Sequence, residues 1–296
     1  MIGAVDIGGT KIAVGMVAES GQLISRLENP TAPIQGPEFG QKLIIDMLHQ
    51  TSSEAGGQLC GIGIGCTGPV DPLKGVMGHI EFLPGWEGLN LPDILTHAFH
   101  VSTAIENDAD ATALAEATWG VGRGAKRLIY ITISTGIGGG IVLDGELYRG
   151  ADGSHPEIGH QVIDPAGPLC YCGAHGCWES LASGSALAQR GKLATAYDVC
   201  EAAERGDASA LSAVEQEGFY LGIGLANLIS LFVPDIIALG GGVMQSSILF
   251  WDKINKVIQS TCGLVPYKKT RLLLTSLGRD VGLLGAAQVW IKRFGS

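Results

Sequence analysis

Short apolar runs alternate with longer amphipathic stretches along the chain, and turn residues separate them. Apolar runs bounded by glycine, proline, asparagine or aspartate are typical of buried β-strands. They predict strands within Ile2–Thr10, where the chain runs into a Gly-Gly turn, and at Lys11–Val17, Gln22–Asn29, Cys60–Cys66, Val101–Glu106, Arg127–Ser134, Ile141–Leu143, Asp235–Leu239 and Arg271–Thr275. Apolar positions at helical spacing predict helices at Phe39–Ser53, Leu91–Phe99, Ala109–Trp119, Ala208–Leu231, Ile248–Gln259 and Val281–Arg293. This alternation indicates an α/β fold.

The order strand, polar glycine turn, strand occurs twice, once at the start of the chain and again at Arg127–Leu143. Such a recurrence suggests a duplicated architecture. The longest uncharged stretch, Gly218–Pro234, is short for a membrane span and contains Asn227 and Ser230. We therefore expect it to form a buried helix and the protein to have no membrane partner.

Composition excludes several classes of protein. The 296 residues are 46% hydrophobic and only 16% charged, which rules out a disordered chain. The net charge of −10 leaves little basic surface for a nucleic acid, so we expect a small-molecule partner. The chain shows no leader pattern, and its seven cysteines are an odd number. Both features favour a reducing, cytoplasmic location over a secreted disulfide framework.

Three glycine-rich turns follow predicted strands: Asp6–Thr10, Thr135–Gly140 and Leu239–Gly242. Successive backbone N–H groups in such turns can bind an anion, and glycine lets a phosphate approach closely. The third turn precedes a predicted helix, whose N-terminus would add positive potential. Together the turns predict a nucleotide phosphate site at which Asp6 holds Mg²⁺ directly or through water. The alternative is that each turn is only a tight hairpin.

The dipeptide Asn107-Asp108 lies at the end of a predicted strand and just before a predicted helix. Ligands of α/β sheets bind at such strand ends, and a carboxylate there can accept the proton of a hydroxyl nucleophile. Asparagine and aspartate are also favoured helix N-caps. Both interpretations stay open at this point.

Three cysteines and several histidines are concentrated between residues 154 and 180. His160, Cys170, Cys172 and Cys177 suit a closed tetrahedral Zn²⁺ site of a structural kind. An iron–sulfur cluster or three free thiols are the alternatives, and His155 and His175 are rival nitrogen ligands. Glu157 and Glu179 flank these ligands, so the metal could aim both carboxylates, although both could equally be exposed surface charges.

These motifs together resemble those of the ROK family of sugar kinases and related repressors, within the actin/hexokinase/Hsp70 fold. The resemblance extends from Ile2 to about Ala287. It assigns the nucleotide to Asp6, Gly8, Gly9, Thr10 and Lys11 of the first motif, to Thr135, Gly136, Gly138 and Gly139 of the second, and to Gly240, Gly241 and Gly242 of the third. It makes Asp108 the catalytic base, assigns the sugar to Gly68, Asn107, Asp108, Glu157, His160 and Glu179, and ranks His160 first as the nitrogen ligand of zinc.

The resemblance implies two lobes, each built on a five-stranded mixed sheet, with ATP and sugar in the cleft. The small lobe would be 1–118 with the closing helix 281–296, and the large lobe 119–280. The implied activity is ATP-dependent phosphorylation of the 6-hydroxyl of a hexose, with Mg²⁺ and structural Zn²⁺ and with a homo-oligomeric state. Glucose is the first expectation.

An N-acetylated hexosamine, mannosamine or glucosamine, is the alternative substrate. A non-catalytic sugar-sensing regulator is the alternative of another class, but only five residues precede Asp6, where such repressors carry a helix-turn-helix. A chaperone-like ATPase would not need the zinc loop. The sequence departs from the family pattern at Phe82, at Ser154-His155-Pro156 and at Asp110, near the expected sugar pocket.

Overall fold

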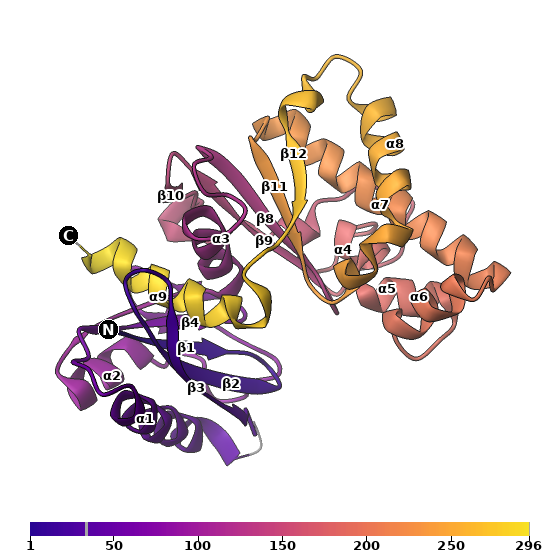
Figure 1. The fold of residues 1–296 in the computed structure, drawn as a ribbon. Coiled ribbons are helices and arrows are strands. Elements are labelled where there is room, and N and C mark those ends of the chain that lie inside the picture. The colour runs from indigo at the N-terminus through magenta and orange to yellow at the C-terminus, as the bar shows by residue number, and fades with distance from the viewer. Residues whose placement is uncertain (33–34, 296) are drawn as a thin grey trace. The chain divides into compact units, whose positions relative to one another are not determined.

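Two five-stranded mixed sheets organise the chain, as predicted (Figure 1). The computed structural model describes residues 1–32 and 35–295. The first sheet has the order β3-β2-β1-β4-β7 and comprises β1 (Ile2–Ile7), β2 (Lys11–Val17), β3 (Leu23–Pro30), β4 (Gly61–Cys66) and β7 (Ser102–Asn107). The second has the order β10-β9-β8-β11-β12 and comprises β8 (Arg127–Ile133), β9 (Ile137–Leu143), β10 (Glu146–Leu147), β11 (Ile236–Gly240) and β12 (Arg271–Leu274). A small pair is formed by β5 (Val70–Asp71) and β6 (Val76–Met77).

Helices connect these strands. They are α1 (Gly36–Ala55), α2 (Leu91–Phe99), α3 (Asp108–Thr118), α4 (Trp178–Ala182), α5 (Gly184–Gly191), α6 (Ala196–Glu204), α7 (Ala208–Phe232), α8 (Trp251–Thr261) and α9 (Val281–Phe294). The predicted helix at Leu91–Phe99 has the same bounds as α2, and the other predicted helices overlap observed ones. The elements β5, β6, β10 and α4–α6 were not predicted; the three strands have two residues each and α4 has five, which is too short to show a hydrophobic period.

The chain divides into two compact units. Unit 1 comprises Met1–Gly124, Gly140–Pro156 and Ser276–Ser296, and unit 2 comprises Ala125–Gly139 and Glu157–Thr275. This grouping differs from the predicted lobes at 119–124, 140–156 and 276–280. Within unit 1, ion pairs tie the segment 149–155 to the end of β7 and the start of α3. Residues 33–34 and 296 of the predicted small lobe lie outside the described residues.

In unit 1, β4 shows how the sequence decides the packing of the first sheet. Ile62 and Ile64 join the buried cluster that includes Ile44 and Leu48 of α1. The glycines that alternate with them, Gly61, Gly63 and Gly65, leave the opposite face of the strand without side chains, and α9 packs there (Figure 1). A Cβ added at Gly63 would lie 1.7 Å from the carbonyl oxygen of Ala286, so only glycine permits this close approach.

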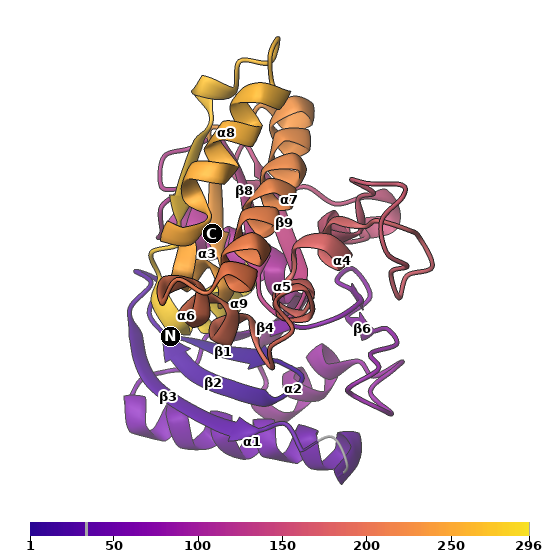
Figure 2. The ribbon, with the colours of Figure 1, turned by 90° about the vertical axis from the view of Figure 1, so that its right-hand side faces the viewer.

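In unit 2, α7 and α8 lie side by side (Figure 2). The uncharged stretch Gly218–Pro234, predicted to form a buried helix, is helical as far as Phe232; one side of it is buried, whereas Phe219 and Leu231 are exposed. Gly224 packs against the indole of Trp178, which is fully buried. None of the helices in the described part of the chain is long and apolar enough to cross a membrane.

Two predicted elements at the glycine turns differ from the structure. The second turn was expected to extend from Thr135 to Gly140, but β9 already begins at Ile137, so Gly138 and Gly139 are strand residues. A Cβ at Gly139 would lie 2.4 Å from the carbonyl oxygen of Tyr130, which explains glycine within the strand. The third turn leads into a 3₁₀ segment, Val243–Leu249, and α8 starts only at Trp251, not at Ile248.

Candidate active site

The carboxyl ends of three parallel strands in unit 1 bring two predicted site residues together. The register pairs Asp6 of β1 with Gly65 of β4, and Gly65 with Glu106 of β7. Asp108 follows two residues later, as the first residue of α3. Burial raises the pKa of the Asp6 carboxyl to about 7, and the charge of Asp108 contributes to that increase. Burial also raises the pKa of Asp108 above its usual value.

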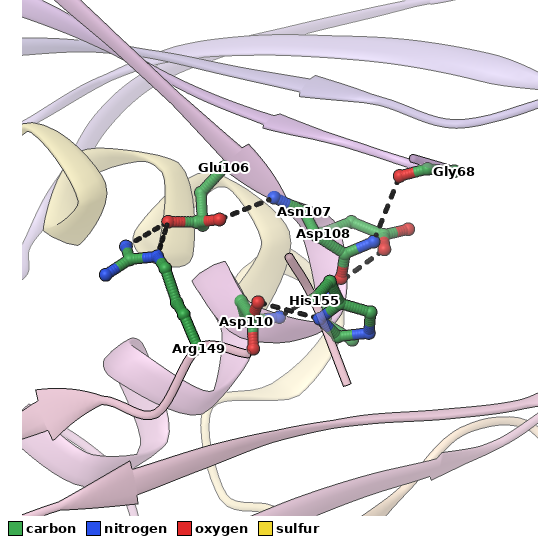
Figure 3. Close-up of polar contacts among 8 residues, drawn as sticks. Gly68, Glu106, Asn107, Asp108, Asp110, Arg149 and His155 are labelled. Atoms are coloured by element: carbon green, nitrogen blue, oxygen red, sulfur yellow. Dashed lines mark hydrogen bonds and ion pairs between the residues drawn. The ribbon is translucent and has the colours of Figure 1, made fainter. Parts of the chain in front are cut away.

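Asn107 acts as the N-cap of α3, so one of the two interpretations of this residue is confirmed. Its side-chain oxygen accepts hydrogen bonds from the backbone N–H groups of Ala109, at 2.8 Å, and Asp110, at 3.3 Å. Its amide nitrogen donates to the carbonyl oxygen of Gly68, at 3.2 Å (Figure 3). Gly68 has a φ of +81° and lies in the loop that follows β4. The cap therefore links two residues that were predicted to bind the sugar.

Glu106 and Asp110, which lie two residues before and two residues after Asp108, are each paired with a side chain of the segment after β10 (Figure 3). Arg149 forms an ion pair with buried Glu106 through two guanidinium nitrogens, one of them 3.1 Å from the carboxylate. The Nδ1 atom of His155 lies 2.7 Å from Oδ2 of Asp110, which has no exposed surface. Neither pair was predicted, because nothing in the local sequence relates residues that are about 45 positions apart.

The first glycine turn is a tight hairpin turn in which some of the backbone N–H and C=O groups already form hydrogen bonds within the protein. The N–H of Gly8 donates to the carbonyl oxygen of Lys11, and the carbonyl oxygen of Gly8 accepts from the hydroxyl of Thr31. The Lys11 ammonium lies 3.0 Å from Glu28 and is exposed. Gly9 lies under the ring of Phe82, because a Cβ there would come within 2.6 Å of the ring. Thr10, which lies between Gly9 and Lys11, is exposed.

In unit 2, the second and third glycine turns meet. The N–H of Gly242 donates to the hydroxyl of Ser134, at 3.3 Å, next to Thr135 and Gly136. Gly241 has a φ of +91°, and a Cβ there would lie 2.2 Å from the carbonyl oxygen of Ile133. A Cβ at Gly242 would meet nothing within 4 Å, so its surroundings are open. Gly240 ends β11 and is buried.

The four predicted metal ligands are also together in unit 2. One ligand atom from each of His160, Cys170, Cys172 and Cys177 lies within 4.8 Å of the other three. The Nδ1 atom of His160 faces Cys170, at 3.6 Å from its sulfur, and Cys172 and Cys177 are 3.5 Å apart. Three thiols and one imidazole at this spacing fit the donor set and size of a tetrahedral zinc site. Of the rival ligands, His175 bonds instead to the carbonyl oxygen of Gly167.

Beside this cluster, Tyr171 and Glu179 form contacts that the sequence analysis did not anticipate. The Tyr171 hydroxyl lies 3.0 Å from Nε2 of His160. Its pKa is raised, because neighbouring atoms shield the hydroxyl from water and the carboxylates of Glu179 and Glu157 disfavour a phenolate. Glu179 accepts a hydrogen bond from the N–H of Ile137, at 2.7 Å. A Cβ at Gly136 would lie 2.3 Å from that carboxylate, so Glu179 packs on the second glycine turn.

Comparison with known proteins supports the class and then the family. A solved structure of a ROK family glucokinase from Streptomyces griseus, in complex with glucose and AMPPNP, has a TM-score of 0.81 and 33% identity, with 97% of both chains covered. The two mixed sheets and this neighbour define an actin-like ATPase fold, as predicted. The ROK family model matches residues 2–293, and the chain therefore belongs to the ROK family.

Two relatives of this chain differ in what they do. The glucokinase of Thermotoga maritima is 33% identical over 98% of this chain and 97% of its own. The xylose repressor of Bacillus spizizenii is 34% identical over 87% of this chain and 68% of the repressor. The chain is thus about equally similar to a kinase and to a repressor.

Proposed function

We propose that this chain is an ATP-dependent hexose kinase that phosphorylates the 6-hydroxyl of its sugar, with glucose as the first candidate. The observation that carries the proposal is the pair of carboxylates Asp6 and Asp108 at the carboxyl ends of parallel strands. Membership of the ROK family and the similarity to glucokinases support the class of reaction.

Asp108 is the proposed catalytic base. Its carboxylate accepts the proton of the sugar hydroxyl as the oxygen bonds to the γ-phosphorus, and the bond from that phosphorus to the ADP oxygen breaks. The carboxylate is held in place because one of its oxygens accepts the N–H of Ala109, at 2.8 Å. Burial raises the pKa of Asp108, which makes its carboxylate a stronger base than that of an exposed aspartate.

Asp6 is the residue proposed to hold Mg²⁺, directly or through water. The fit rests on its surroundings: the pKa of Asp6 is raised by burial and by Asp108, and a divalent cation would relieve both effects. When bound, Mg²⁺ would neutralise charge on the transferring phosphoryl group. The glycine turns at Gly8–Gly9, Thr135–Gly136 and Gly240–Gly242 would offer backbone N–H groups to the phosphates.

We propose that His160, Cys170, Cys172 and Cys177 hold a structural Zn²⁺. All four positions of a tetrahedral ion would then be filled by protein, which leaves none for water. The metal would fix an irregular loop that leads directly into α4 and so would position Glu179. Glu157, His160 and Glu179 would contact the sugar in this proposal, and Asn107 and Gly68 would do so from unit 1.

The experiment is ADP release with glucose, fructose, mannose, N-acetylglucosamine and N-acetylmannosamine. We expect one sugar to stimulate release strongly, and Asp108→Asn to reduce kcat by about 10² to 10⁴. Asp93→Asn, on the exposed face of α2, is the matched control and should keep the wild-type rate. A hexosamine as the preferred sugar would replace glucose by the alternative substrate.

The similarity to a xylose repressor keeps a non-catalytic sugar sensor as the second candidate. Saturable sugar binding in calorimetry without sugar-dependent ADP release would favour the sensor and reject the kinase. A homo-oligomeric state also remains a proposal, which light scattering of the purified protein tests directly.

A further inference from the structure

One buried carboxylate next to the proposed base has a single polar partner. Asp110 lies in the first turn of α3, two residues after Asp108, and has no exposed surface. Its Oδ2 atom lies 2.7 Å from Nδ1 of His155. Its Oδ1 atom has no hydrogen-bond partner among the described residues. Burial of an ionised carboxylate costs much free energy unless a partner compensates its charge. His155 is the group that compensates the charge of Asp110.

The carboxylate fixes the state of the imidazole. An ionised carboxylate only accepts hydrogen bonds, so Nδ1 of His155 must carry the proton that it donates to Asp110. The second ring nitrogen then becomes the atom whose protonation can change, and Figure 3 shows it on the side of the ring away from Asp110. The nearby negative charge favours the imidazolium. Asp110 and His155 together then carry no net charge.

His155 also acts on Asp108. Burial raises the pKa of Asp108, whereas the charge of His155 lowers it and the charge of Asp110 raises it. The charges of the two partners therefore have opposite effects on the pKa of the proposed base. The other titratable or charged groups near Asp108 are Asp6 on β1, Cys66 on β4, and the Glu106–Arg149 pair at the end of β7.

We propose that His155 is a positioning residue for Asp108: by pairing with Asp110 it cancels the charge of the nearest buried carboxylate and keeps Asp108 in the ionised form that accepts a proton. This inference rests on the proposed function. The two partners are also positions at which the sequence departs from the family pattern that it otherwise resembles, and the structure joins them to each other. His155 touches no reacting atom in this role.

The pair itself is tested without any assay of activity. The imidazole ¹⁵N spectrum of the full chain is recorded between pH 6 and 9, and the signals of His155 are assigned from their loss in His155→Gln. We expect Nδ1 to stay protonated throughout, with only Nε2 responding to pH. Comparable amounts of the two neutral tautomers at pH 9 would overturn the pair.

The positioning role is tested by the acidic limb of the pH profile of kcat/KM for the sugar. His155→Gln leaves the charge of Asp110 uncompensated, so the acidic limb should move to higher pH by about one unit. At pH values below the limb, kcat/KM of the variant should then be about tenfold lower than that of wild type. Adding Asp110→Asn to His155→Gln removes that charge and should return the limb to its wild-type position. A residue that only supports packing would give the double variant the larger defect.

The matched control is His79→Gln. His79 also pairs with a carboxylate of unit 1, that of Glu87 at 3.1 Å, but both side chains are exposed. The acidic limb of the pH profile of His79→Gln should stay at the wild-type pH. If His155→Gln does not fold, a double variant that folds with a wild-type limb still supports the inference.

The outcomes separate the inference from the function beneath it. An unmoved limb in His155→Gln, or a double variant shifted as far as the single one, overturns the role of His155 while the kinase stands. If the wild-type chain shows no sugar-dependent ADP release, the proposed function fails, and the role given to His155 fails with it. The ¹⁵N spectra decide the Asp110–His155 pair in either case.

Discussion

Replacement of Asp6 by asparagine should stabilise the metal-free protein while it removes the proposed Mg²⁺ residue. Asparagine has the shape of the neutral aspartic acid and carries no charge to bury. A Cβ at Gly282 would lie 2.2 Å from Oδ2 of Asp6, so α9 covers the carboxylate closely. The ionised carboxylate is therefore held at a cost, which the asparagine avoids.

The magnitude follows from the pKa. Moving the pKa of a carboxyl from its ordinary 3.8 to about 7 corresponds to about 4 kcal/mol of preference for the neutral form. A raised pKa of this kind contributes stability that is complete below pH 3.8 and is lost as pH rises through about 7. We expect Asp6→Asn to gain up to about 4 kcal/mol at pH 8 and about 2 kcal/mol at pH 5, since partial solvent access screens the charge.

The assay is urea unfolding of wild type and Asp6→Asn at pH 5 and pH 8 in EDTA, followed by the same series with Mg²⁺. In EDTA the variant should exceed wild type by more at pH 8 than at pH 5. Mg²⁺ should stabilise wild type at pH 8 and leave the variant unchanged. An equal difference at both pH values would refute the electrostatic reasoning, and an equal response to Mg²⁺ would remove Asp6 from the metal site.

Three further predictions address packing, zinc and the base. Gly63→Ala should lose about 3 kcal/mol in urea unfolding, because the new Cβ would collide with the backbone of Ala286, whereas Gly263→Ala meets nothing within 4 Å and should change little. Metal analysis should find about one Zn²⁺ per chain, and Cys177→Ser should lower both that content and the Tm; full zinc in the variant would contradict the assignment. Because burial raises the pKa of Asp108, kcat/KM should decrease at low pH with a midpoint above pH 3.8. A midpoint at or below pH 3.8 would argue against this residue as the base.

Local spacing was enough to predict much of the site. The ends of two strands, one at Asn107 and one just after Asp6, and the close spacing of three cysteines could be predicted because each depends on only a few neighbouring residues. The cap concerns only one residue of the dipeptide: Asn107 caps α3, whereas Asp108, the proposed base, is the first residue of that helix. The sequence could not show this division, since both residues are favoured at helix starts.

Glycine-rich segments were the least predictable from sequence. Gly138 and Gly139 were expected in a turn, but they lie in β9, where the backbone of β8 comes too close for a side chain. Glycine permits both open turns and close packing, so its presence alone does not distinguish them. The same ambiguity hid the role of Gly136, which leaves room for the Glu179 carboxylate.

Hydrophobic period and short spacing predicted the α/β class, the grouping of Cys170, Cys172 and Cys177 and the position of Asn107-Asp108 at a strand end, whereas the choice of His160 came from the family resemblance. Which distant groups meet could be learned from the tertiary structure alone. Three contacts join residues on different elements: the hydrogen bond between His155 and Asp110, the hydrogen bond from the N–H of Ile137 to Glu179, and the contact of Phe82 with Gly9. Register between parallel strands and the path of the returning chain set those meetings, and no local pattern encodes either.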